Sequence, residues 1–306
     1  MRNRDTRPRR RGLTPVLLGL VLAVAAVTIP DSTVEPADML LVEVERATTV
    51  DLNPDVLWIL AVGSDARPGE QMTRTRGDAL QLVGINTKTG AATAIGIPRD
   101  SYVPIPGVGS DRVNAAMYYG GPELLGETVG NLIGIQPEYV FVTGFRTFQK
   151  MINSIGGVYV HNPVAFSDPY LKAQGFKKGK IRLGGYTSLA YARVRKGLIG
   201  GDFDRSANQQ RILRGIHHKI RQKAGTRGFL ERGVLSAMAN METNVSPATL
   251  YRIAHAISTL RARNFSTCVV QGAIGDVGGA SVVLPYTDQA RRYGDDARED
   301  ATISHC

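Results

Sequence analysis

Three apolar runs separated by short polar breaks stand out between residues 56 and 97. Residues 56–62 are all apolar and end at Gly63, which predicts a buried strand. Residues 79–85 and 91–97 predict two more strands, and the polar loop 86–90 between them predicts a hairpin. If the three strands form an up-down-up meander, one edge of the sheet holds the end of the first, the start of the second and the end of the third.

Charged residues occupy those three positions. Asp65 follows the first strand, Asp78 precedes the second, and Arg99 follows the third. One charged loop residue is usually just solvated, but three at one sheet edge predict a site. Paired carboxylates suit Mg²⁺, and the guanidinium fork matches phosphate oxygens. Three more arginines stand in later polar breaks and extend the prediction to a site for a divalent cation and a phosphate ester: Arg193, Arg195 and Arg205.

The remaining pattern predicts an α/β fold. A strand at 138–142, a helix at 145–155 and a strand at 158–161 suggest a βαβ unit, and hence a mixed sheet. Residues 161–183 form a long, irregular, lysine-bearing stretch typical of a lid or binding loop. Apolar stripes predict helices at 205–223, 228–240 and 247–261. We therefore expect a single domain with a central mixed, partly antiparallel sheet flanked by helices.

A short predicted helix at 186–192 delivers Arg193 and Arg195. Residues two apart on a helix point about 200° apart, so both reach one phosphate only if the chain leaves the helix there. Arg205 begins the next predicted helix, whose N-terminus adds partial positive charge next to a bound anion. Asp202 or Asp204 is placed to cap that helix.

The N-terminal region predicts membrane attachment. Six arginines within the first 11 residues precede the largely apolar stretch 13–29. This pattern predicts a single transmembrane helix with the N-terminus in the cytoplasm and the rest outside; a cleaved signal peptide is the alternative. The expected plan is a cytoplasmic basic tail at 1–12, a signal-anchor at 13–29, an extracytoplasmic stalk at 30–50, and one catalytic domain at 51–306.

Net charge limits the classes of binding partner, and the spacing of the cysteines limits their possible roles. The formal net charge is +10, of which the basic tail contributes half. A basic exported domain fits anionic lipids, wall polymers or phosphorylated substrates, and no RNP, zinc-finger or recognition-helix pattern points to nucleic acid. The two cysteines, Cys268 and Cys306, have no metal-ligand spacing, so either a disulfide or two free thiols is compatible with the sequence.

Several short motifs follow one another in a fixed order over roughly residues 56–223. They include Gly63-Ser64-Asp65-Ala66-Arg67, Arg76-Gly77-Asp78, Ile97-Pro98-Arg99-Asp100-Ser101-Tyr102, Tyr191-Ala192-Arg193-Val194-Arg195, Asp202-Phe203-Asp204-Arg205 and Gln209-Gln210-Arg211. In this order the chain resembles the LytR-CpsA-Psr family of bacterial cell-wall proteins. The resemblance implies an enzyme that transfers a polyprenyl-pyrophosphate-linked glycopolymer (teichoic acid, capsule or arabinogalactan type) onto peptidoglycan, forming a phosphodiester.

The resemblance also implies roles for individual residues. Asp65 and Asp78 would hold Mg²⁺, with Mn²⁺ as an alternative, and the prenyl chain would lie in an apolar tunnel between sheet and helices. The pyrophosphate would be bound by five arginines: Arg76, Arg99, Arg193, Arg195 and Arg205. The chain departs from the family pattern at Ala79, Asn153 and Asn208, where Thr or Ser, Asp and Arg are usual.

The candidate catalytic residues are Arg99, Asp100 and Asp204. Phosphoryl transfer needs charge neutralisation and in-line positioning more than covalent help. Asp100, Asp204 or Asp202 is a candidate to accept the proton of the attacking hydroxyl, although Asp100 also fits a turn residue. Two other functions remain open at this point: a non-catalytic polyprenyl-phosphate-binding or regulatory protein, and a pyrophosphatase with water as acceptor.

Overall fold

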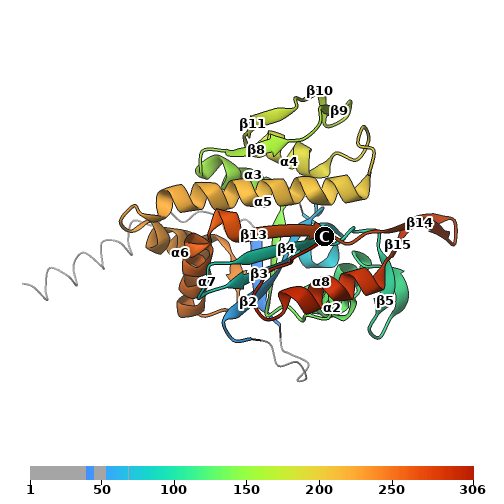
Figure 1. The fold of residues 1–306 in the computed structure, drawn as a ribbon, viewed down its shortest axis with the longest axis horizontal. Coiled ribbons are helices and arrows are strands. Elements are labelled where there is room, and N and C mark those ends of the chain that lie inside the picture. The colour runs from blue at the N-terminus through green and yellow to red at the C-terminus, as the bar shows by residue number, and fades with distance from the viewer. Residues whose placement is uncertain (1–38, 45–52, 68) are drawn as a thin grey trace, which may run out of the picture. The chain divides into compact units, whose positions relative to one another are not determined.

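The computed structural model describes residues 39–44, 53–67 and 69–306 (Figure 1). A seven-stranded mixed sheet lies at the centre, in the order β12-β1-β7-β2-β3-β4-β13. Strands β2, β3 and β4 run antiparallel to one another, whereas β7 is parallel to β2 and β13 is parallel to β4. The strands are β1 (Met39–Glu43), β2 (Val56–Ser64), β3 (Gly77–Asn86), β4 (Ala92–Gly96), β7 (Tyr139–Gly144), β12 (Glu242–Thr243) and β13 (Phe265–Val269).

The predicted meander is confirmed. Val56 pairs with Asn86 across β2 and β3, and Gln81 pairs with Gly96 across β3 and β4. These strands form because nearly continuous apolar runs are buried on both faces of a sheet covered from two sides. Trp58 lies fully buried in β2.

Helices cover both faces of the sheet. Helices α2 (Ala115–Ile133) and α8 (Thr287–Ala297) pack on one face, where Leu60, Leu82 and Ile95 point inward. Helices α5 (Asp202–Ala224), α6 (Phe229–Asn240) and α7 (Pro247–Thr259) lie on the other, over Ile85 and Ala94. The two cores are separate because side chains alternate between the faces along each strand.

Residues 145–201 build a small layer on the far side of α5 (Figure 1). It contains α3 (Phe145–Ser154), α4 (Gly185–Arg193), the pair β8 (Val158–Asn162) with β11 (Gly179–Leu183), and the pair β9 (Phe166–Asp168) with β10 (Lys172–Phe176). Its own apolar core centres on Tyr191, with the rings of Phe166 and Phe176 at 5.5 and 5.1 Å.

Two predictions fail in this layer. The βαβ unit is wrong, because β8 pairs with β11 rather than joining the central sheet, which is mixed for other reasons. The prediction of an irregular loop at 161–183 is also wrong, since β9, β10 and β11 occupy most of this segment. Lysines hid the alternation there, although Phe166, Phe176 and Leu183 are buried against Tyr191 and its neighbours.

The predicted stalk needs correction too. Met39–Glu43, inside the expected stalk 30–50, is strand β1 of the central sheet, and it pairs with β7 and β12. Leu41 is buried there because β1 completes the sheet beside β7. The predicted tail 1–12 and anchor 13–29 lie outside the described residues. Among the helices that are described, none has the length and apolar character needed to cross a bilayer.

Two hairpins and a disulfide complete the fold. The hairpins are β5 (Tyr102–Ile105) with β6 (Gly109–Arg112), and β14 (Gly272–Val277) with β15 (Ala280–Pro285). Cys268 of the edge strand β13 is bonded to Cys306, which decides between the two alternatives that the sequence left open. The disulfide ties the last described residues to the sheet edge.

Candidate functional site

The strand ends bring Asp65, Asp78 and Arg99 together. Asp65 follows β2, Asp78 is the second residue of β3, and Arg99 lies three residues beyond β4. The guanidinium of Arg99 contacts the Asp78 carboxylate directly. Burial and the negative charge of Asp78 raise the pKa of Asp65, while Arg99 opposes that rise. The three residues therefore share one electrostatic environment, as the meander predicts.

Further ion pairs extend this contact into a chain of alternating charge. Arg193 Nε lies 3.4 Å from the second carboxylate oxygen of Asp78. Arg99 Nε lies 3.7 Å from Asp100 Oδ1, and Arg195 Nη2 lies 3.4 Å from Asp100 Oδ2. Burial alone would lower the pKa of Arg99, but the carboxylates of Asp78 and Asp100 outweigh it and raise the pKa. Arg99 is thus a permanent cation at the centre of the site.

The series of ion pairs ends in the first turn of α5. Arg195 Nε lies 3.4 Å from Asp202 Oδ1, and the guanidinium of Arg205 contacts the same oxygen. The side chains of Asp202 and Arg205 are each only 4% exposed. Burial raises the pKa of Asp202, opposed by Arg205, and burial lowers the pKa of Arg205, opposed by Asp202. The pair is held together because neither charge has water to solvate it.

Helix α4 ends where the two arginines diverge, as predicted. Its last residue is Arg193, and Val194 leaves the helical conformation with ψ 131°. The Arg193 guanidinium lies over the Phe145 ring, 4.4 Å from its centroid. Arg195 then belongs to the following turn, so its guanidinium reaches the same group of carboxylates from outside the helix.

The capping prediction for α5 is wrong. Gly201 is the N-cap, and no side chain caps it; Asp202 is held in its ion pairs instead. Asp204 Oδ2 accepts a hydrogen bond of 2.8 Å from the Gly200 amide. The structure therefore places Asp100 and Asp202 among the arginines, whereas the Asp204 carboxylate is turned to the loop before the helix.

Arg76 occupies a neighbouring position. It lines a cavity of about 540 Å³ together with Asp65, Arg74 and Tyr118. The backbone amide of Asp65 donates to the Arg76 carbonyl, which fixes the two residues side by side. Of the predicted pyrophosphate-binding arginines, Arg76 stands on the open side of Asp65, whereas Arg99, Arg193, Arg195 and Arg205 belong to the ion-pair chain.

With this geometry in view, comparison with known proteins is decisive. The model of the LytR_cpsA_psr family matches residues 31–298. The chain belongs to the LytR-CpsA-Psr family. The resemblance that the sequence motifs predicted is therefore confirmed.

Individual relatives support the assignment. A Bacillus licheniformis protein named polyisoprenyl-teichoic acid–peptidoglycan teichoic acid transferase TagU is 34% identical over 178 residues, which is 57% of this chain and 56% of that protein. An Enterococcus faecalis protein of the same name is 30% identical over 217 residues, 70% of each chain. The chain thus spans little more than half the length of the first relative. A solved structure described as TagT bound to LI-WTA superposes with a TM-score of 0.65 at 26% identity, covering 85% of this chain and 96% of that one.

The LytR-CpsA-Psr chain has a further site residue that the sequence argument missed. Arg112, the last residue of β6, places its Nε 3.9 Å from Asp100 Oδ1 and donates from Nη2 to the Ser281 carbonyl. Arg112 pairs with Tyr102 at the open end of the β5–β6 hairpin, two residues after Asp100, so its place beside Asp100 depends on the pairing of these two strands.

Buried glutamines hold α5 against the sheet. Gln81 Nε2 donates to Gln209 Oε1 over 3.1 Å, and Gln209 Nε2 donates to the Ala192 carbonyl over 3.2 Å. Gln210 Nε2 bridges the carbonyls of Ala94 and Cys268 at 3.1 and 2.6 Å. These hydrogen bonds fix the first turns of α5 against the central sheet, and therefore fix the position of Arg205.

Two of the departures from the family pattern make specific contacts. Asn208 Oδ1 accepts from Arg211 at 2.6 Å, and Asn153 Oδ1 accepts from the Gly185 amide at 2.8 Å. Asn153 thereby supports the start of α4. Neither asparagine contacts the ion-pair chain, so its arginines keep their arrangement despite these substitutions.

An apolar strip begins at the charged edge. On the face covered by α5, α6 and α7, four side chains of the central strands remain partly exposed: Ala61, Ala79, Val83 and Phe141. The strand register places all four on that face, and Ala79 directly follows the metal-ligand candidate Asp78 on the chain. Partial exposure is unusual at the centre of a covered sheet, so this strip offers apolar surface next to the arginines of the ion-pair chain.

Asp65 and Asp78 fit a hard divalent cation, although the described residues contain no group of three or more His, Cys, Asp or Glu side chains arranged for a metal. Magnesium commonly takes only one or two protein carboxylates and completes its shell with water and substrate phosphate. The raised pKa of Asp65 reflects burial and then the nearby Asp78 charge, and a divalent cation between the two would relieve that repulsion.

Proposed function

We propose that this protein is an extracytoplasmic phosphotransferase that moves a polyprenyl-pyrophosphate-linked glycopolymer onto peptidoglycan. One observation carries the proposal: five guanidinium groups converge on three carboxylates at the ends of the central strands, beside a partly exposed apolar strip. A cationic pocket that adjoins apolar surface suits a ligand with a doubly charged phosphate head and a hydrocarbon chain. The names of the TagU relatives point to the same class of reaction.

The carboxylates keep the arginines in place before the ligand arrives. Asp78, Asp100 and Asp202 each contact at least two guanidinium groups. A pyrophosphate presents more negative charge and more acceptor oxygens than a carboxylate, so it can exchange into these contacts without a new fold. The prenyl chain then lies along the apolar strip that includes Val83 and Phe141.

The reaction follows from this placement. A hydroxyl oxygen of the acceptor glycan attacks the phosphorus bonded to the polymer, and a new P–O bond forms. The bond between that phosphorus and the bridging oxygen breaks, and polyprenyl monophosphate leaves with the bonding electron pair. The proton of the attacking hydroxyl passes to a phosphate oxygen of this leaving group. Arg99, Arg195 and Arg205 stabilise the charge that builds on the phosphate oxygens. The contacts of Asp100 suit it to orienting Arg99, Arg112 and Arg195.

Asp65 and Asp78 would hold Mg²⁺, or Mn²⁺ in its place, which would supply charge neutralisation at the pyrophosphate when bound. Asp78 would then exchange part of its contact with Arg99 for the cation. This frees the Arg99 guanidinium for a phosphate oxygen, so the metal and the substrate would bind together rather than separately.

An extracytoplasmic domain on a single-pass anchor is part of the proposal. The Cys268–Cys306 disulfide supports it, because such bonds persist mainly in oxidising compartments outside the cytoplasm. A polyprenyl-linked donor and a peptidoglycan acceptor are also found there.

The test is turnover by the purified full-length chain. It is incubated with a polyprenyl-pyrophosphate-linked saccharide, soluble peptidoglycan strands and Mg²⁺, and products are identified by mass spectrometry. We expect polyprenyl monophosphate and a saccharide joined to the glycan by a phosphodiester. Arg99→Gln should reduce the rate by at least about 100-fold if it contributes transition-state charge stabilisation. The control Arg221→Gln removes an exposed charge from α5 and should leave the rate unchanged.

Other outcomes identify the alternatives. Saccharide phosphate released equally with and without acceptor indicates a pyrophosphatase. Lipid that stays intact but bound, in wild type and in Asp65→Asn alike, indicates a binding protein. Either result contradicts the transferase.

A further inference from the structure

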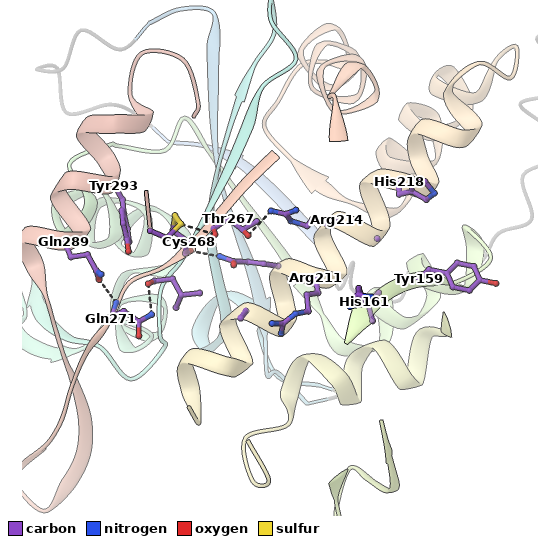
Figure 2. Close-up of a pocket in the computed structure, with 16 residues that line it drawn as sticks. Tyr159, His161, Arg211, Arg214, His218, Thr267, Cys268, Gln271, Gln289 and Tyr293 are labelled. Carbon is purple, nitrogen blue, oxygen red and sulfur yellow. Dashed lines mark hydrogen bonds between the residues drawn. A yellow bond between two sulfur atoms is a disulfide. The ribbon is translucent and has the colours of Figure 1, made fainter. Parts of the chain in front are cut away.

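A second cavity lies against α5 (Figure 2). Its volume is about 690 Å³, and its walls are α5, β8, the edge strand β13, α8 and the disulfide. On α5 the lining residues Ala207, Arg211, Arg214 and His218 follow a helical spacing and form one stripe. That stripe is about half a turn away from Arg205, so the helix, about 10 Å wide, separates the two sites.

The cavity is cationic, and its charges are not neutralised. Arg211, Arg214, His161 and His218 line it, and no Asp or Glu side chain does. Arg211 donates to the amide oxygen of Asn208, and Arg214 donates to the Phe265 carbonyl at 2.8 Å. Within the described residues neither arginine has an ion pair, in contrast to the arginines of the first site. Neutral acceptors hold these guanidiniums in place and leave their charge available.

The rest of the lining suits a sugar. Two tyrosines, Tyr159 and the buried Tyr293, also line it, while Gln271 and Gln289 supply amides that both donate and accept. The Tyr159 ring is 44% exposed, and the ammonium groups of Lys180 and Lys219 lie 5.1 and 5.8 Å from its centroid. Positive charge therefore continues from the cavity onto the adjoining surface.

The surroundings reinforce this field. Residues 145–201 carry ten Lys and Arg against the single carboxylate of Asp168. Clustered cations raise the local concentration of an anionic ligand before it enters the cavity. A flat membrane surface could meet this outer face, but it could not enter a cavity walled by a helix, a strand and a second helix.

We propose that this cavity binds an anionic segment of a cell-wall glycan, a saccharide carrying carboxylate or phosphate groups. This deepens the proposed function, since a glycopolymer or its acceptor strand must extend beyond the reacting phosphate. A chain of a few sugar units can contact both sides of α5. The cavity then contributes affinity for the polymer while Arg99 and its neighbours act on the pyrophosphate.

The experiment measures binding by the full-length chain in detergent, with no lipid donor present. The probe is hyaluronate hexasaccharide, which carries carboxylates, and chitohexaose is the neutral comparison. We expect hyaluronate to bind by calorimetric titration, to weaken with added salt, and to bind far more tightly than chitohexaose. Arg214→Gln should weaken it about two- to five-fold, as the loss of an exposed charge does.

Ala207→Phe tests the cavity without changing charge, because the added ring occupies part of it, and it should weaken binding. Arg221→Gln is the matched control on the same helix outside the lining, and it should bind as wild type does. Circular dichroism checks that every variant is folded.

The proposal is overturned if Ala207→Phe binds normally, if Arg221→Gln loses as much affinity as Arg214→Gln, or if inorganic phosphate displaces the probe at equal concentration. Binding to anionic vesicles that Ala207→Phe leaves intact would assign the basic surface to lipid instead. Because no transfer is measured, failure of the transferase would leave this result unaffected, and the reverse also holds.

Discussion

The buried pair of Asp202 and Arg205 makes the sharpest prediction. Each side chain is 4% exposed, and burial shifts both pKa values toward the neutral forms. Asp202→Asn leaves the Arg205 guanidinium buried without its nearest counter-charge. Removing one partner of such a pair costs about 3–5 kcal/mol of unfolding free energy. Replacing both, as in Asp202→Asn with Arg205→Gln, should recover most of that loss, because no charge then remains to be desolvated.

Urea unfolding provides the measurement. Trp58 is the only tryptophan and is fully buried, so its fluorescence reports the loss of the central sheet. The two single variants and the double variant form a cycle whose interaction energy isolates the pair. A second measurement is the increase in unfolding free energy when pyrophosphate is added. This increase should be larger for Asp202→Asn than for wild type, because the Asp202 carboxylate no longer competes for Arg205.

Three results would refute this reasoning. If Asp202→Asn costs less than about 1 kcal/mol, the charge is not buried in solution as the structure describes. If the double variant loses the sum of the single losses, the residues are not coupled. If pyrophosphate stabilises the variant less than it does wild type, Asp202 helps to bind the anion rather than holding its place.

Three further predictions concern stability. Cys306→Ser removes the disulfide, whose cysteines are separated by 38 positions, and should lower the unfolding free energy by up to about 4 kcal/mol. Reduction of wild type should lower it by the same amount. Equal stability of the oxidised and reduced protein would contradict this prediction. Gly84→Ala places a methyl 2.5 Å from the Trp58 ring and should cost about 1–3 kcal/mol or more in urea unfolding, whereas Gly233→Ala, with open space around it, should not destabilise. The pKa of Asp65 is raised in the folded state, so ionisation of this carboxyl lowers the unfolding free energy of wild type as the pH rises from 3.8 through the folded pKa. Asp65→Asn cannot ionise, so its unfolding free energy should rise relative to that of wild type from pH 4 to pH 7 in metal-free buffer. A difference that does not change with pH would contradict the shift.

Part of the site was predictable from the sequence because it depends on local pattern and strand direction. Three successive apolar runs, the last two joined by a short hairpin loop, favour a meander, and a meander places Asp65, Asp78 and Arg99 at one edge. The exit of the chain from α4 at Arg193 likewise follows from the glycine-containing stretch that comes after it. These inferences needed only neighbouring residues.

Other features depended on contacts between distant segments. Strand β1 has four consecutive apolar residues, 39–42, inside an otherwise polar segment, and only the folded chain shows that it lies between β7 and β12. Strand β8 has an ordinary strand pattern, but its partner is β11 rather than the central sheet. The position of Arg112 beside Asp100 depends on a hairpin folding back over the strand ends.

The amino-acid sequence by itself therefore determined the family, the meander and the identity of most charged residues at the phosphate site. The tertiary structure alone decided which carboxylate pairs with which guanidinium, that Cys268 and Cys306 are joined, and that a cationic cavity lies behind α5. The physical reason is that periodicity and turn residues act over a few positions, whereas ion pairs and cavities form between segments that meet only when the chain is folded.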